Sequence, residues 1–186
     1  GNNIVDENDK NGTGFLARLC KKWERATLPA TVSGIRTVNL RLGIILTPTG
    51  GMLKQLLTPF KLGLGGKLGN GQQYLSWISL EEIGPMVEFL INHKNISGPV
   101  NAVSPTPVTN TEFTKQLSYA LKRPAIFHLP KFLLKIIFAE LANELLLAST
   151  RAIPEKLQQA GYSFEKPDIK DIFKTLSKRT DHHDEP

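Results

Sequence analysis

Apolar and polar residues alternate between helical and strand patterns over the first two thirds of the chain. Between positions 13 and 27 apolar residues recur three or four places apart, which predicts an amphipathic helix. Residues 34–47 first alternate and then become continuously apolar, a pattern typical of a buried parallel strand. The same reasoning predicts further helices over 52–62, 81–91 and 109–121, and short strands over 74–78 and 100–103. This succession of strands and helices indicates an α/β fold with parallel strands.

The last third of the chain has a more helical pattern. After Arg123 and Pro124 a short strand is expected over 125–129, followed by helices over 130–147, 149–160 and 167–176. The final ten residues are polar, which predicts a disordered tail. We therefore divide the chain into a partial α/β domain (1–122), a small, mostly helical domain (123–176) and a tail (177–186).

Composition narrows the class of partner. The net charge of +6 favours anionic ligands, but the basic residues are scattered, so we expect a small molecule and no nucleic acid. A single cysteine, Cys20, excludes an internal disulfide, and the four histidines lack the spacing of a metal site. Charged residues interrupt the most apolar stretch, 132–147, so no membrane span is expected. With no secretory signal at the start, we expect a cytoplasmic protein; its oligomeric state stays open.

A glycine-rich loop spans residues 61–71. It follows a predicted helix, and Leu68 stands where both the dinucleotide-binding and the phosphate-binding glycine motifs require another residue. Two interpretations stay open. The loop could cover an anionic ligand with Lys61 and Lys67 nearby, or its glycines could serve backbone angles that other residues avoid.

Tyr162 and Lys166 have the spacing of the tyrosine and lysine that transfer protons in many dehydrogenases. There the lysine lowers the pKa of the phenol, and both residues stand one turn apart on a helix. Here Gly161 and Pro167 bracket an alternating stretch, which argues against a helix. We interpret the spacing as coincidental.

Several stretches taken together resemble one family: 15–24, 41–51, 59–78, 98–113 and 144–164. They include Arg-Leu-Gly-Ile-Ile-Leu at 41–46 and Leu-Gly-Leu-Gly-Gly at 62–66. The chain resembles the epimerase-family proteins, atypical extended short-chain dehydrogenases/reductases often labelled nucleoside-diphosphate-sugar epimerases. This resemblance implies the C-terminal portion of a Rossmann-like NAD(P)-binding fold, followed by the family's small C-terminal domain of unknown function. It also implies a glycine-rich cofactor motif ahead of Gly1, so we expect a fragment that binds no dinucleotide alone.

The resemblance further implies NADP or NAD as the cofactor of the full-length protein. Four residues would lie beside its nicotinamide end: Leu42, Gly43, Ile44 and Ile45. Three others would line the substrate pocket: Lys67, Gln72 and Trp77. Burial in the core is the alternative for both isoleucines and for the tryptophan.

The proton-transfer pair of active relatives does not match this sequence. If Glu24 is the acidic residue that ends the family's helix before the arginine-containing strand, the lysine falls at Cys20 and the tyrosine at Leu16. Neither side chain can perform the usual step, so the catalytic residues stay unknown. We expect an NAD(P)-dependent epimerase- or reductase-like protein acting on a nucleotide sugar or a similar small molecule. The alternative is a catalytically inactive dinucleotide-binding scaffold or a protein-interaction module.

Overall fold

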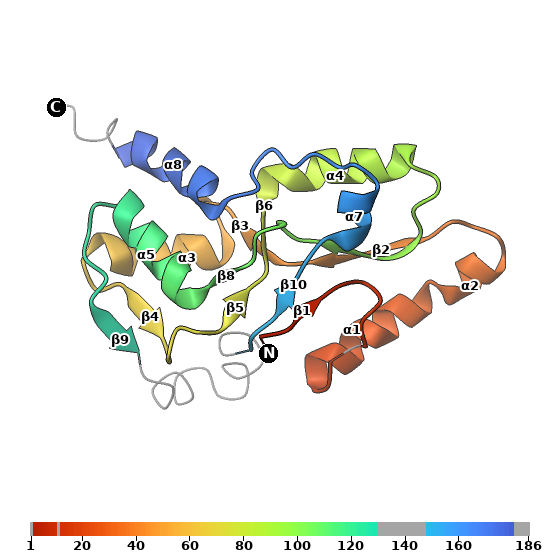
Figure 1. The fold of residues 1–186 in the computed structure, drawn as a ribbon, viewed down its shortest axis with the longest axis horizontal. Helices are drawn as coiled ribbons and strands as arrows, with labels where there is room; N and C mark the ends of the chain where they lie inside the picture. The colour runs from red at the N-terminus through yellow and green to blue at the C-terminus, as the bar shows by residue number, and fades with distance from the viewer. Residues whose placement is uncertain (1, 11, 130–147, 181–186) are drawn as a thin grey trace.

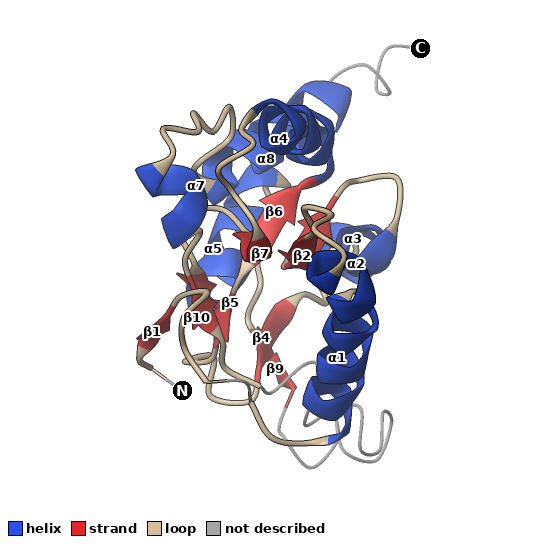
Figure 2. Cartoon of the chain, turned by 90° about the vertical axis from the view of Figure 1, so that its right-hand side faces the viewer, coloured by secondary structure: helices blue, strands red, loops and turns tan. Residues whose placement is uncertain are grey.

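The computed structural model describes residues 2–10, 12–129 and 148–180. Its helices surround a set of short strands (Figures 1 and 2). The helices are α1 (Phe15–Ala26), α2 (Leu28–Val32), α3 (Gly51–Lys61), α4 (Leu80–Asn92), α5 (Asn110–Ala120), α7 (Glu155–Gln159) and α8 (Ile169–Thr180). Within the described ranges, no helix is long and apolar enough to cross a lipid bilayer.

The strands form pairs that are mostly parallel. The parallel pairs are β2 (Val38–Leu42) with β7 (Gly98–Ala102), β3 (Ile44–Leu46) with β6 (Trp77–Ser79), β4 (Gly66–Leu68) with β9 (Phe127–Leu129), and β1 (Ile4–Val5) with β10 (Arg151–Ala152). One pair, β5 (Tyr74–Leu75) with β8 (Val108–Thr109), is antiparallel. The expected α/β class with parallel strands is therefore confirmed.

The apolar run from Val38 to Leu46 changes its pairing partner at Gly43. The amide of Gly43 donates to Ala102 O on β7, whereas the next amide, that of Ile44, donates to Ser76 O beside β6. The sequence predicts one strand here, and the structure divides it into β2 and β3. The division lets one stretch of chain join two other strands.

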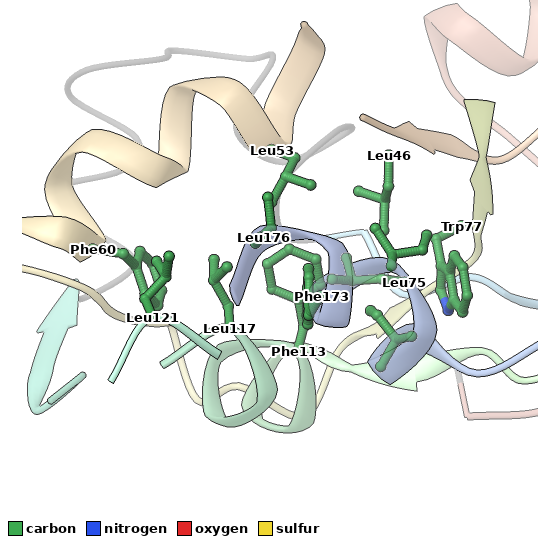
Figure 3. Packing of buried hydrophobic residues seen from close by; sticks show 12 residues of the cluster. Leu46, Leu53, Phe60, Leu75, Trp77, Phe113, Leu117, Leu121, Phe173 and Leu176 are labelled. Carbon is green, nitrogen blue, oxygen red and sulfur yellow. The ribbon is translucent and has the colours of Figure 1, made fainter. Parts of the chain in front are cut away.

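Two apolar clusters hold the fold together. The first lies between α3, α5 and α8, where the rings of Phe113 and Phe173 meet edge to face at 5.4 Å (Figure 3). The second joins α4 and α7 to β7 through Met86, Val100 and Leu157. The C-terminal helices thus contribute to both clusters, α8 to the first and α7 to the second.

The region expected to form a helix over 149–160 begins as a strand instead. Tyr74 N donates to the hydroxyl of Ser149, and the hydroxyl of Ser76 donates to Thr150 O, which holds this stretch extended beside β5. Helix α7 starts only after Pro154. The prediction was therefore wrong for its first half, because contacts distant in sequence override the local pattern.

The end of the chain also differs in extent from the expectation. Helix α8 continues to Thr180, into the segment assigned to the tail. The helix expected over 130–147 lies outside the described residues.

Candidate functional site

An ion pair joins α1 to β2 next to the expected cofactor segment. Arg41 Nε lies 2.6 Å from Glu24 Oε1, and Arg41 Nη2 lies 2.9 Å from Glu24 Oε2. This two-pronged contact lowers the pKa of Glu24 and raises the pKa of Arg41, chiefly through the hydrogen bonds themselves. Both groups are therefore charged, and they fix the face of α1 that meets the strand.

The same face of α1 carries the two positions that the family resemblance assigns to the proton-transfer pair. Leu16 and Cys20 precede Glu24 by two turns and one turn of helix, so the three side chains follow one another along the face. Cys20 is exposed, and a thiolate at this position would raise the pKa of the Arg41 guanidinium further through its charge. Position 16 thus offers no ionisable group and position 20 offers only a thiol.

Glu7 is a buried acid that the sequence patterns did not single out. It is only 4% exposed, and its Oε1 accepts the amide of Asn101 at 2.9 Å. Its Oε2 has no hydrogen-bond partner among the described residues, and its charge raises the pKa of Arg41. Asn101 is the register partner of Arg41 across β2 and β7. Glu7 therefore adds a second carboxylate to the surroundings of Arg41.

The four expected cofactor residues have different environments. Leu42 is 51% exposed at the end of β2, whereas Ile44 packs on the first apolar cluster and Ile45 on the second. A Cβ on Gly43 would lie 2.8 Å from Ser76 O, so the protein's own backbone already requires this glycine. The isoleucines are partly buried against the two clusters, and Leu42 alone of the four presents a largely exposed side chain. Their contact with the cofactor stays a prediction.

The three expected substrate residues also differ. Lys67 is half-buried on β4, and Gln72 is exposed in the following turn. Trp77 is 0% exposed and donates its indole N–H to Thr106 O at 3.0 Å. The tryptophan is a core aromatic in this structure, as the alternative held, and full burial keeps it from contacting a ligand in this conformation.

The glycine-rich loop has a tightly packed backbone. It contains β4, where a Cβ on Gly66 would run into Phe127 O, and Gly65 packs its backbone against the ring of Phe60. Gly71 has a φ of +75° and approaches the hydroxyl of Thr111. The glycines thus serve positive φ angles and close backbone packing, as the second interpretation expects, and the cover over an anionic ligand stays a prediction.

Tyr162 and Lys166 contact separate acids. The hydroxyl of Tyr162 donates to Glu82 Oε1 at 3.0 Å, while Lys166 pairs with Glu81. Burial, and then the bond to Glu82, raises the pKa of Tyr162 well above its usual value. A dehydrogenase tyrosine needs the opposite shift, so these two residues do not form a catalytic pair.

The described residues contain no cluster of three or more histidine, cysteine, aspartate or glutamate side chains suited to a metal ion.

Comparison with known proteins identifies the family. The model of a domain of unknown function, DUF1731, matches residues 129–176. An epimerase family protein of Mycobacterium bovis is 50% identical over 161 residues, which cover 87% of this chain and 54% of that protein. The crystal structure of human epimerase family protein SDR39U1 with NADPH superimposes with a TM-score of 0.88 at 30% identity, over 95% of this chain and 60% of that one. The chain belongs to this epimerase family.

A nucleoside-diphosphate sugar epimerase from Corynebacterium glutamicum is also similar, with a TM-score of 0.75 and 35% identity over 92% of this chain and 33% of the other. These structures confirm the Rossmann-like class of the epimerase-family chain. The chain spans about half the length of the curated relatives it matches, 54% for the mycobacterial protein. The boundary set at residue 123 stays a prediction, although the domain model begins close to it, at 129.

Proposed function

We propose that this epimerase-family protein binds NADP(H) and acts on a nucleotide sugar or a similar small molecule. The observation that carries the proposal is the likeness to human SDR39U1, whose structure was determined with NADPH, across 95% of the present chain. We propose NADP(H) rather than NAD(H) as the cofactor because that structure contains NADPH. The mycobacterial relative, at 50% identity, supports the same family assignment.

The residues at the end of β2 fit one part of such a cofactor. In open parallel sheets, ligands bind outside the carboxyl ends of the strands, which is where Leu42 lies. The exposed side chain of Leu42 offers an apolar surface for a nicotinamide ring, and Ile44 and Ile45 support the strand from the two cores. The cofactor, when bound, supplies or accepts a hydride. The charged pair of Glu24 and Arg41 holds α1 against this end of the sheet.

A dinucleotide-binding scaffold without turnover is the second candidate. It is favoured by one observation: the α1 face that leads to Glu24 carries Leu16 and Cys20, where proton transfer needs a phenol and an ammonium group. Of the two side chains, only that of Cys20 carries an ionisable group.

Fluorescence titration with NADPH tests cofactor binding. The protein to use is a chimera in which this chain replaces the part of the Mycobacterium bovis relative that it matches. We expect saturable binding, with NADPH bound more tightly than NADH. If the fluorescence of the chimera shows no saturable change up to millimolar NADPH, the proposal is wrong.

Replacement of Lys67 tests the substrate side of the site. In the chimera, Lys67→Gln is expected to weaken the binding of a nucleoside-diphosphate sugar about tenfold, because the substitution removes a positive charge from β4. The control is Lys54→Gln on α3, which makes the same charge change elsewhere. If both variants bind the nucleoside-diphosphate sugar with equal affinity, Lys67 is not part of the substrate site.

Turnover separates the two candidates. A chimera that binds NADPH but converts no nucleoside-diphosphate sugar is a scaffold. In that case Leu16→Tyr combined with Cys20→Lys restores the phenol and the ammonium group at one-turn spacing. Gain of conversion of the nucleoside-diphosphate sugar by this variant alone would identify these positions as the reason for inactivity.

A further inference from the structure

A hollow lies at the opposite end of β2 from Leu42. Val38 and Gly98 pair in register, so β2 and β7 begin side by side. The second half of α1, helix α2 and the loop between α4 and β7 border a cleft of about 660 Å³ there. Figure 1 shows α2 and the loop after α4 at the same end of β2. This volume lies within the range of sites for small molecules.

The cleft is strongly basic, and we call it the basic cleft. Four cationic side chains line it: Lys21, Arg25, Arg36 and Lys94. The acidic residue among its lining side chains, Glu24, is neutralised by Arg41. Among the described residues, none of the four cations forms a salt bridge. Positive charge of this density without internal compensation attracts anions.

Several polar groups of the basic cleft are held in place. Arg36 Nη1 donates to Leu90 O and Ile96 O, each at 3.0 Å, which anchors the guanidinium group at the end of α4. The hydroxyl groups of Thr31 and Thr37 lie 2.7 Å apart. Fixed guanidinium and hydroxyl donors are the groups that hold phosphate oxygens in proteins.

We propose that the basic cleft binds a small molecule with two or more adjacent phosphate groups. The four cations lie on α1, on the segment before β2 and on the loop before β7. Their combined positive charge is more than the negative charge of a single phosphate group can neutralise. An extended nucleic-acid surface would need a longer basic stripe with aromatic side chains. The site is separate from the one proposed around Leu42, because it lies at the amino ends of β2 and β7.

Calorimetric titration with inorganic tripolyphosphate at low salt tests the proposal. The test variant is Arg25→Gln/Lys94→Gln, which removes two exposed cations that make no salt bridge in the described structure. The matched control is Lys54→Gln/Lys115→Gln, with the same charge change on α3 and α5, outside the cleft. Circular dichroism confirms that each variant is folded. The 186-residue chain and the chimera are both titrated. If one of the two proteins self-associates, the titration of the other still gives the result.

We expect one saturable site in the unmodified protein and in the control, and roughly tenfold weaker binding by the test variant. Inorganic monophosphate is expected to bind more weakly than tripolyphosphate. Three results would overturn the proposal: no saturable binding at millimolar tripolyphosphate, equal weakening in both variants, or tighter binding of a short RNA lost through the same substitutions. The last would assign the cleft to nucleic acid.

Discussion

Gly43 stands where one apolar run changes strand partner, and its missing side chain is what permits the change. A Cβ at this position would meet Ser76 O at 2.8 Å and the side chain of Val103 at 2.9 Å. One of these neighbours is backbone, so relief would require moving β6 relative to β2. The glycine of the Arg-Leu-Gly motif is thereby explained by packing within the sheet.

Gly43→Ala is expected to lower the free energy of unfolding by about 1–3 kcal/mol, because the added methyl group overpacks the contact between the strands. Gly84→Ala is the control, since nothing lies within 4 Å of a Cβ there. Alanine at this helical position is expected to stabilise α4 by up to about 1 kcal/mol. Urea unfolding of both variants measures the difference, and equal stabilities would contradict the packing argument.

The ion pair between Glu24 and Arg41 predicts a pH dependence. Because the pKa of Glu24 is lowered in the folded protein, its stabilisation is complete above the usual value of 4.5 and is lost as the pH falls through the lowered pKa. Glu24→Gln is expected to cost about 1 kcal/mol at pH 7, since the pair is partly exposed.

The difference in unfolding free energy between Glu24→Gln and the unmodified protein should therefore shrink as the pH is lowered below 4.5. Unfolding curves at a series of pH values measure it. A difference that stays constant down to acid pH would mean that the charge of Glu24 contributes nothing.

At the scale of elements, the segment from Tyr162 to Lys166 is held on α4 by one buried acid. Glu82 is 3% exposed and accepts the hydroxyl of Tyr162 as well as the amides of Glu165 and Lys166. This segment connects α7 to α8, and each of these helices packs in a different apolar cluster. Glu82 therefore fixes the connection between the two cores.

Tyr162→Phe is expected to destabilise the protein by about 1–2 kcal/mol, because the carboxylate of Glu82 loses a donor while it remains buried. Tyr119→Phe is the control: that side chain is 84% exposed, and its change is expected to stay within about 0.5 kcal/mol. Thermal unfolding compares the two. A similar loss in both variants would show that the contact to Glu82 is not the cause.

The sequence predicts the longer elements better than the short ones. Helices α1, α4 and α5 lie within about two residues of the expected bounds, because each has a strong helical period of its own. Strands β1, β4 and β10 were missed, since two or three residues carry no period and pair with partners far away in the chain.

The candidate site was predictable only in part, for the same reason. Through the family resemblance, the sequence predicts the Leu42 segment as a cofactor contact and points to the unusual residues at positions 16 and 20. It does not reveal which of the four segment residues faces outward, since that depends on the switch of partners at Gly43. Nor does it show that Glu7 is buried, because the carboxylate reaches Asn101 from 94 positions away.

At the scale of the whole molecule, β2 separates two chemically different ends. Leu42 and the ion pair of Glu24 with Arg41 lie towards its carboxyl end, and the basic cleft lies at its amino end. Helix α1 runs past both: Glu24 contacts Arg41 and also borders the cleft, which Lys21 and Arg25 line as well. The cofactor proposal and the phosphate proposal are tested with different ligands and different substitutions, so they can fail independently.

The cofactor site is tested most directly by methyl NMR of the chimera, with labelled leucine and isoleucine side chains, during titration with NADPH. We predict saturable shifts that are largest for Leu42 and smaller for Ile44 and Ile45, with Leu157 in the second apolar cluster as an unshifted reference. Saturable shifts elsewhere that leave Leu42 unchanged would contradict the placement of the nicotinamide end. The absence of any shift at saturating NADPH would contradict the proposed function itself.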